Sequence, residues 1–158
     1  AGRFDVDASR RALLGHSYGG LFALYTALTR PRLFSDYLAI SPSLWWGDGF
    51  LYALPSAGAS GKTRVLLGAG DQERGQRPAF AEATDTPSTS VPAMCDNVVC
   101  FAQWLQTGHA DWVIDHRSFE GSYSQIWWMA VRRQSCLTDR LPAPHPGTGR
   151  CSRPAPAF

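Results

Sequence analysis

Residues 12–24, ALLGHSYGGLFAL, decide the fold of this 158-residue chain. A short apolar run ends at Leu14, the pentapeptide Gly15-His16-Ser17-Tyr18-Gly19 follows, and a helix-forming run begins at Gly20. The pattern G-x-S-x-G between a strand and a helix is typical of a nucleophile elbow, in which a serine occupies a sharp, strained turn. We therefore predict a strand, a tight turn at Ser17 and a helix.

Each position of this turn has an expected task. Gly15 and Gly19 lack Cβ atoms that would clash with the neighbouring strand and helix. Ser17 is raised above the sheet at the start of the helix, where the N–H of Tyr18 can face a developing oxyanion. The alternative is that Ser17 is an ordinary N-cap, whose hydroxyl bonds to the first turn of the helix.

The rest of the chain alternates between strand and helix patterns. We predict strands at 11–14, 36–41, 63–68 and 112–119, and helices at about 18–29, 92–106 and 125–133. Such alternation predicts an α/β fold with a mostly parallel sheet, and right-handed crossovers are expected to place helices on both faces. Residues 1–135 are expected to form this domain, and the proline-rich residues 136–158 a tail without a fold.

Two helices carry apolar stripes that are expected to face the core. The first stripe comprises Leu21, Leu24, Tyr25 and Leu28, widened by Phe22 and Ala23. The second comprises Met94, Val98, Phe101, Ala102 and Leu105. Both helices are therefore predicted to pack closely against the sheet.

Composition excludes several classes of protein. The formal net charge of +2 argues against a nucleic-acid-binding surface, and no apolar run is long enough to span a membrane. The four cysteines lack metal-site spacing, so we expect free thiols and neither a metal nor a cofactor. Residues 1–5 lack the apolar stretch of a signal peptide, so a cytoplasmic location is expected, with the periplasm left open.

Polar and aromatic side chains gather where the strands end. Ser17, Glu73, the loop after Ile40 and the loop after Phe119 all follow carboxyl ends of strands, where ligands of α/β folds bind. In the loop after Ile40, we expect one of Trp45 and Trp46 to line a substrate pocket and the other to pack in the core. Glu73 has the alternative of a solvated loop carboxylate.

Several segments resemble one known family. They are residues 15–24, 30–34, 41–46 (SPSLWW), 70–73 (GDQE), 94–97 and 119–121, within about residues 9–133. This pattern resembles the esterase D-like family of α/β-hydrolases, the group that includes the enterochelin and salmochelin (siderophore) esterases. The resemblance implies part of an α/β-hydrolase fold. Only sixteen residues precede Ser17, so the N-terminal strands of that fold are expected to be missing.

The resemblance also implies a serine hydrolase acting on small carboxylic esters, with siderophore-type lactones as one option. Ser17 matches the nucleophile, and Glu73 matches the acid, with Asp71 as the alternative. Tyr18 would supply an oxyanion donor, while His16 and Trp45 would line the substrate site. Where the family carries its catalytic histidine, this chain has Tyr123. The histidines left open as a substitute base are His109, His116, His145 and His16, with His16 favoured as a pocket wall.

Two hypotheses of different classes follow. The first is an esterase that works through an acyl-enzyme on Ser17; an acyltransferase would differ only in its acceptor. The alternative is a catalytically silent or truncated relative that at most binds a ligand, since a serine without a base is a poor nucleophile. An incomplete sheet would leave an open edge beside the first strand, which predicts self-association.

Overall fold

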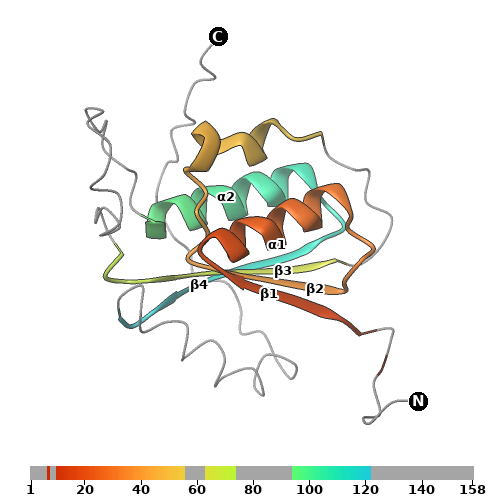
Figure 1. The fold of residues 1–158 in the computed structure, drawn as a ribbon, viewed down its shortest axis with the longest axis horizontal. Coiled ribbons are helices and arrows are strands. Elements are labelled where there is room, and N and C mark those ends of the chain that lie inside the picture. The colour runs from red at the N-terminus through yellow and green to blue at the C-terminus, as the bar shows by residue number, and fades with distance from the viewer. Residues whose placement is uncertain (1–6, 8–9, 56–62, 74–93, 122–158) are drawn as a thin grey trace.

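The computed structural model describes Asp7 and residues 10–55, 63–73 and 94–121 (Figure 1). Its elements, in chain order, are β1 (Ala12–His16), α1 (Tyr18–Thr29), β2 (Asp36–Ile40), the 3-10 segment η1 (Trp46–Ala53), β3 (Arg64–Gly70), α2 (Met94–Gly108) and β4 (Val113–Phe119). All four predicted strands and the first two predicted helices are present, with bounds shifted by no more than two residues. The predicted helix at 125–133 and the tail at 136–158 lie outside the described residues.

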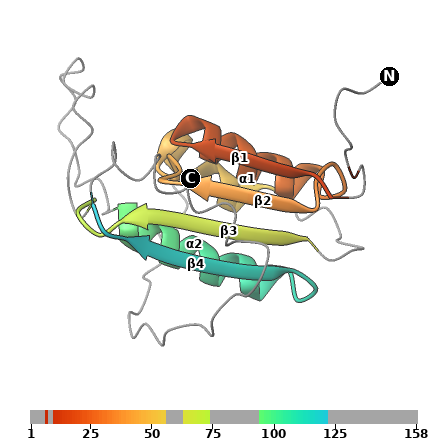
Figure 2. The same ribbon diagram turned by 90° about the horizontal axis from the view of Figure 1, so that it is seen from below.

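The four strands form one parallel sheet in the order β1-β2-β3-β4 (Figure 2). Each strand pairs with the next one in sequence, so that Leu14, Leu38, Leu66 and Asp115 lie side by side across the sheet. Parallel strands bring all their carboxyl ends to one end of the sheet, which we call the carboxyl end. Among the described strands β1 and β4 are the edges, and self-association through the β1 edge stays a prediction.

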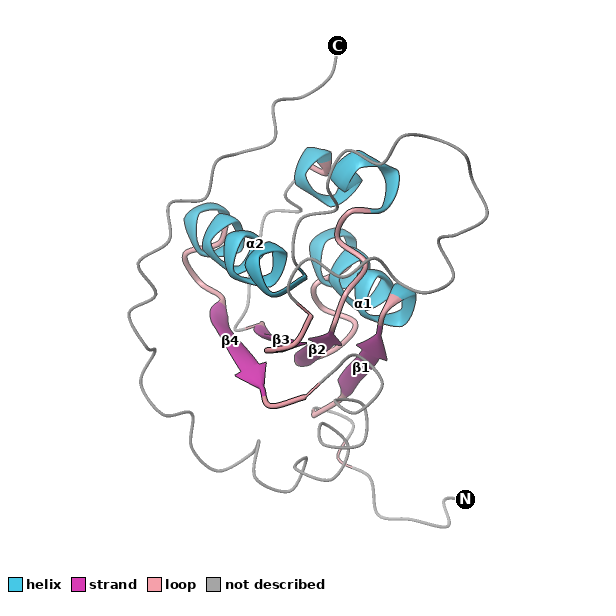
Figure 3. Cartoon of the chain, turned by 90° about the vertical axis from the view of Figure 1, so that its left-hand side faces the viewer, coloured by secondary structure: helices cyan, strands magenta, loops and turns pink. Residues whose placement is uncertain are grey.

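Both α-helices lie on the same face of this sheet. Figure 3 shows α1, α2 and η1 on one side of the four strands. The strand order advances in a single direction, and right-handed crossovers then place every connection on the same face. The prediction of helices on both faces is therefore not met by the described helices, and the third predicted helix, at 125–133, lies outside the described residues.

The core lies between the helices and the face of the sheet that they cover. α1 packs on β1 and β2, and α2 packs on β3 and β4. The sheet contributes Tyr37, Ala39, Val65, Leu67 and Ala69, which are all fully or nearly fully buried. Nearly every residue of β2 and β3 is buried, but the side chains divide with a period of two: these five lie in the core under the helices, whereas Ile40 packs with Leu14 and Phe119 in a second cluster.

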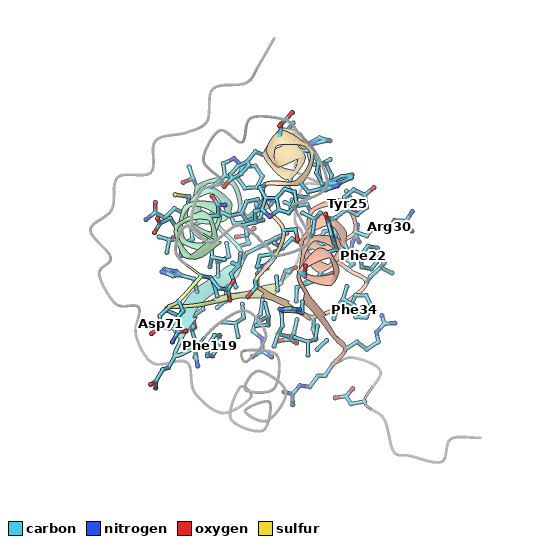
Figure 4. All side chains as sticks on the ribbon, turned by 60° about the vertical axis from the view of Figure 1, so that its left-hand side comes forward. Phe22, Tyr25, Arg30, Phe34, Asp71 and Phe119 are labelled. Carbon is cyan, nitrogen blue, oxygen red and sulfur yellow. The ribbon has the colours of Figure 1, made fainter. Side chains whose placement is uncertain are left out.

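The buried stripe of α1 differs in part from the predicted one. Leu21, Leu24 and Leu28 are buried as predicted, whereas Tyr25 and Phe22 are 41% and 59% exposed. Figure 4 shows both aromatic side chains on the outer side of α1. Ala23 is buried as predicted, and Ala27, which the predicted stripe did not include, is buried as well. Small side chains at this i, i+4 spacing let the helix axis approach the sheet closely, and bulky neighbours are turned outward.

The apolar stripe of α2 is confirmed where its side chains are described. Val98, Phe101, Ala102 and Leu105 are buried. The segment η1 was not predicted, because three successive residues of its Trp-Gly-Asp-Gly sequence adopt positive φ (60°, 53° and 75° at residues 47–49). Its Leu51 reaches the core and is fully buried. None of the described helices has the length and apolar character needed to cross a membrane.

One cysteine contradicts the prediction of free thiols. Cys100, on α2, is disulfide-bonded. Its partner is not among the side chains that the structure describes. An even number of cysteines was the signal in the sequence that a disulfide could form.

Candidate active site

The turn between β1 and α1 has the strained geometry that the sequence predicts. Ser17 has φ 58° and ψ −120°, a conformation that costs free energy in any residue with a Cβ atom. Its N–H donates to the carbonyl of Ile40 at 2.9 Å, and its carbonyl accepts from the N–H of Leu21 at 3.0 Å. Strand, kink and helix are therefore held to one another by the backbone of Ser17.

Close backbone approach explains two of the glycines around Ser17. A Cβ atom on Gly15 would lie 2.0 Å from the carbonyl oxygen of Gly19, so no side chain fits there. A Cβ atom on Gly20 would meet the carbonyl oxygens of Gly15 and Ile40 at 3.2 Å. Gly19 has open space around it, so the prediction that its missing Cβ avoids a clash was wrong. Gly15 and Gly20 are the residues that permit the tight turn.

The hydroxyl of Ser17 does not cap the helix. Ser17 occupies the N-cap position of α1 without a side-chain capping bond. Its Oγ lies instead 3.3 Å from the Oγ of Ser43, and the side chain is partly buried. The simple N-cap alternative is therefore wrong. Ser43, which is only 3% exposed, was missed as a site residue because nothing in the sequence indicates a contact across 26 positions.

Glu73 lies at the carboxyl end of the sheet, just after β3, and is only 7% exposed. Its Oε1 accepts hydrogen bonds from Ser41 Oγ at 2.8 Å and from the N–H of Gly70 at 2.9 Å. Its Oε2 is buried and has no hydrogen-bond partner among the residues that the structure describes. Burial raises the pKa of Glu73 above its ordinary value, while the bonds from Gly70 and Ser41 oppose that rise. The alternative of a solvated loop carboxylate is wrong.

Asp71, the alternative acid, is used differently. Its carboxylate Oδ1 accepts from the N–H of Gly121 at 2.9 Å, and its own N–H donates to the carbonyl of Phe119 at 2.8 Å. Figure 4 shows Asp71 and Phe119 together at this end of the molecule. Asp71 is exposed and ties the chain leaving β4 to the chain leaving β3. Of the two carboxylates, Glu73 is the one with a buried oxygen, Oε2, that is available to accept a hydrogen bond from another group.

Aromatic side chains flank the turn at Ser17. Tyr18 is exposed and makes an edge contact with Trp45 at a centroid distance of 6.2 Å. Trp45 is half-buried and lies beside the first residue of α1, and its place in the wall of a substrate site stays a prediction. Trp46 is exposed and packs edge-on against Phe50 at 5.4 Å, so neither tryptophan is a core residue. That half of the prediction was wrong.

The histidines of the described chain are spread over both ends of the sheet. His16 ends β1 beside Ile40 and is half-buried at the carboxyl end. His116 lies inside β4, opposite Leu67, and is separated from β1 by two strands. His109 lies at the opposite end of the sheet, stacked on Trp112 at 4.0 Å, where burial lowers its pKa.

Tyr123 and His145 lie outside the described residues. Of the histidines in the described part of the chain, His16 is the one that lies at the carboxyl end with Ser17. The described residues also contain no group of three or more His, Cys, Asp or Glu side chains that could hold a metal ion.

A parallel sheet whose first described strand leads through a strained serine into a helix defines a fold of the α/β-hydrolase type. The family described as "Putative esterase" matches residues 1–98, more than half of the chain. The chain therefore belongs to this family.

Similar sequences are siderophore esterases. The siderophore enterobactin esterase of Emericella nidulans is 58% identical over 43 residues, which are 27% of this chain and 14% of that protein. The siderophore triacetylfusarinine C esterase of Aspergillus fumigatus is 58% identical over 44 residues, 28% of this chain and 15% of that protein. The ferri-bacillibactin esterase of Bacillus subtilis is 44% identical over 48 residues, 30% of this chain and 17% of that protein.

Solved structures give the same result at the level of the fold. The siderophore hydrolase EstB from Aspergillus nidulans has a TM-score of 0.63 and 26% identity, with 82% of this chain and 48% of that one covered. The enterobactin esterase of Shigella flexneri has a TM-score of 0.59 and 25% identity, with 85% and 31% covered. The chain thus spans less than half the length of these relatives.

Proposed function

We propose that this chain contributes to the hydrolysis of carboxylic esters in siderophores, through an acyl-enzyme on Ser17. The observation that carries this proposal is the strained turn at Ser17, with a hydroxyl that is not used to cap α1. The relatives named above act on enterobactin, triacetylfusarinine C and ferri-bacillibactin by their names, which supports a small siderophore ester as the substrate.

The proposed reaction follows ordinary serine-esterase chemistry. Ser17 Oγ attacks the ester carbonyl, the bond from Oγ to the acyl carbon forms, and the alcohol leaves with the proton that Oγ gives up. Water then adds to the acyl carbon, releases the acid and restores the serine hydroxyl. The N–H of Tyr18, at the first position of α1, would stabilise the oxyanion because first-turn N–H groups lack intrahelical acceptors.

Glu73 would hold the base of this reaction. A buried carboxylate oxygen without a hydrogen-bond partner is costly unless another group donates to it. An imidazole that donates one N–H to Oε2 of Glu73 would be fixed in orientation, and its other nitrogen could accept the Ser17 proton. His16 and Trp45 would line the substrate site beside Ser17.

The test uses a fluorophosphonate probe on the folded chain. We expect labelling of Ser17 and its loss in Ser17→Ala, together with release of linear products from enterobactin. A matched control is Ser35→Ala, because Ser35 bonds Asp36 at the opposite end of the sheet. A folded sample that neither labels nor releases products would refute the proposal.

A catalytically silent relative is the second candidate. It is favoured by Tyr123 at the position where the family carries histidine. A tyrosine is almost fully protonated at neutral pH and is therefore a poor base. Binding of enterobactin that Ser17→Ala leaves unchanged, without product release, would support this candidate over the esterase.

The cellular compartment is also a proposal. The disulfide at Cys100 favours the periplasmic alternative over the cytoplasm, because structural disulfides persist in oxidising compartments. Counting maleimide-reactive thiols before and after reduction, in protein isolated from its native cells, tests this proposal. Full reactivity before reduction would restore the cytoplasmic prediction.

A further inference from the structure

We propose that Ser41-Pro42-Ser43, the three residues that follow β2, form a positioning loop that holds both the nucleophile and the acid. In this proposal, Ser43 positions the side chain of Ser17, and Ser41 positions the carboxylate of Glu73. This inference rests on the proposed function, because it concerns how those two groups are oriented. Neither Ser41 nor Ser43 is assigned a chemical step.

Sheet order explains why this loop can reach both groups. Ser17 follows β1, Glu73 follows β3, and β2 lies between these two strands. Neighbouring strands are about 4.8 Å apart, so the segment leaving β2 lies one strand away from each group. All three residues of the loop are buried, and proline at its centre restricts φ. The loop therefore connects the two groups with little conformational freedom.

Ser43 contacts both the main chain and the side chain of the nucleophile. Its N–H donates to the carbonyl of Ser17 at 3.2 Å, and its Oγ lies 3.3 Å from the Oγ of Ser17. A hydroxyl can donate and accept, so Ser43 can stabilise one side-chain rotamer of Ser17. We infer that this contact keeps Ser17 Oγ away from the helix N-terminus that it would otherwise cap.

Ser41 determines which oxygen of the acid is available. Its Oγ donates to Oε1 of Glu73 at 2.8 Å, and the N–H of Gly70 donates to the same oxygen at 2.9 Å. Two donors on Oε1 leave Oε2 for a further group. Ser41 itself has φ 43°, and its N–H donates to the carbonyl of Gly68 at 2.6 Å. This left-handed turn directs its side chain toward β3.

The Ser43 contact is tested by the rate at which the fluorophosphonate probe modifies Ser17. Losing one hydrogen bond predicts labelling about three- to tenfold slower in Ser43→Ala. Ser43→Thr keeps a hydroxyl and should recover part of the loss. The control Ser35→Ala removes a hydroxyl at the opposite end of the sheet and should label like the wild type. Unchanged labelling in Ser43→Ala, or no recovery in Ser43→Thr, would overturn this half of the proposal.

The Ser41 contact is tested without turnover, by an NMR titration of the Glu73 carboxyl group. The groups that act on its pKa are the Gly70 N–H and the Ser41 hydroxyl, and both lower it. Ser41→Ala and Ser41→Gly should therefore each raise the Glu73 pKa further. Glycine tolerates the positive φ of this position, so agreement between the two variants separates loss of the hydroxyl from backbone strain. A wild-type pKa in both variants would overturn this half.

The two tests separate this inference from the proposed function. If wild-type Ser17 is not labelled, the proposed function fails and the Ser43 assignment fails with it, whereas the titration still decides the Ser41 assignment. If Ser17 is labelled but neither Ser43→Ala nor the Ser41 variants change their readouts, the esterase proposal stands and the positioning loop is refuted.

Discussion

The amino end and the carboxyl end of the same sheet are built differently. At the amino end, plain backbone bonds join the strands, such as the N–H of Arg64 to the carbonyl of Ser35 at 3.0 Å, and Arg64 forms an ion pair with Asp36. At the carboxyl end, Ser17 and Ser41 adopt positive φ, and one buried oxygen of Glu73 has no partner in the described part of the chain.

We interpret the amino end of the sheet as serving stability and the carboxyl end as serving the proposed activity. Positive φ in residues other than glycine and incompletely satisfied buried groups both cost free energy, and they persist where the surrounding structure enforces them. Among the described residues, Ser17, Ser41 and Glu73 show these features at the carboxyl end, where ligands of α/β folds bind, while the amino end has one buried atom of this kind, Nε1 of Trp112. The amino end supplies ordinary structural bonds. Four predictions test this division, in order of decreasing effect.

The largest expected effect is on the free energy of unfolding of Gly15→Ala. A Cβ atom there would lie 2.0 Å from the backbone oxygen of Gly19, which cannot move without breaking the turn. We expect a loss of more than about 3 kcal/mol in urea unfolding, or no folded protein. The matched variant Gly19→Ala has open space and should be neutral or more stable by up to about 1 kcal/mol.

Glu73→Gln should change how stability depends on pH. Because burial raises the folded-state pKa above the ordinary 4.5, the folded wild type binds the proton more tightly than the unfolded chain. The free energy of unfolding of the wild type should therefore fall as the pH rises above 4.5. Glu73→Gln should lack this fall and be the more stable protein at neutral pH, while losing the proposed esterase activity.

Urea unfolding of both proteins across a pH series measures this difference. The sign is the informative part, because an ordinary ion-paired carboxylate gives a stability that rises with pH. If the wild type becomes more stable relative to Glu73→Gln as the pH rises, the strained carboxyl end is not a source of instability.

At the amino end, His109→Phe should remove a slope of the opposite sign. Burial lowers the pKa of His109 below its ordinary 6.5, so the unfolded chain binds the proton more tightly. The wild type should lose stability as the pH falls through 6.5, and the variant should not. Phenylalanine keeps a ring against Trp112 but cannot titrate, so a pH slope that persists in the variant would contradict this account.

The smallest expected effect belongs to Asp36→Asn. This change removes the charge that Arg64 pairs with at the amino end, and the Arg64 side chain is 41% exposed. Exposed ion pairs contribute about 0–1 kcal/mol, so the midpoint of urea unfolding should move only slightly. Labelling of Ser17 should not change at all; a slower rate would show that the two ends are coupled.

The strands, the helix after Ser17 and the apolar stripe of α2 could be predicted because their signals are local. The hydrophobic periodicity and Gly15, two residues before Ser17, act within a few residues. They therefore predict the strand, the turn and the helix without information from distant parts of the chain. The parallel sheet then followed from the alternation of elements. Its carboxyl end therefore brought Ser17 and Glu73 to the same end of the domain, as predicted.

What the sequence did not reveal depends on distant contacts. The burial of Glu73 and the contacts of Ser41 and Ser43 arise from packing between segments more than twenty residues apart. Whether Phe22 faces the core depends on how closely α1 approaches the sheet, since an aromatic residue suits either side of an apolar helix.

The short link from Ile40 to Leu44 has a consequence for anyone who wishes to redesign this scaffold. Ser41 contacts Glu73, and Ser43 contacts Ser17. The number of residues in this link therefore matters as much as their identity. An inserted or deleted residue there would shift one hydroxyl out of reach while leaving the other in place. Directed-evolution libraries should therefore vary the exposed aromatics of α1 and keep the length of this link constant.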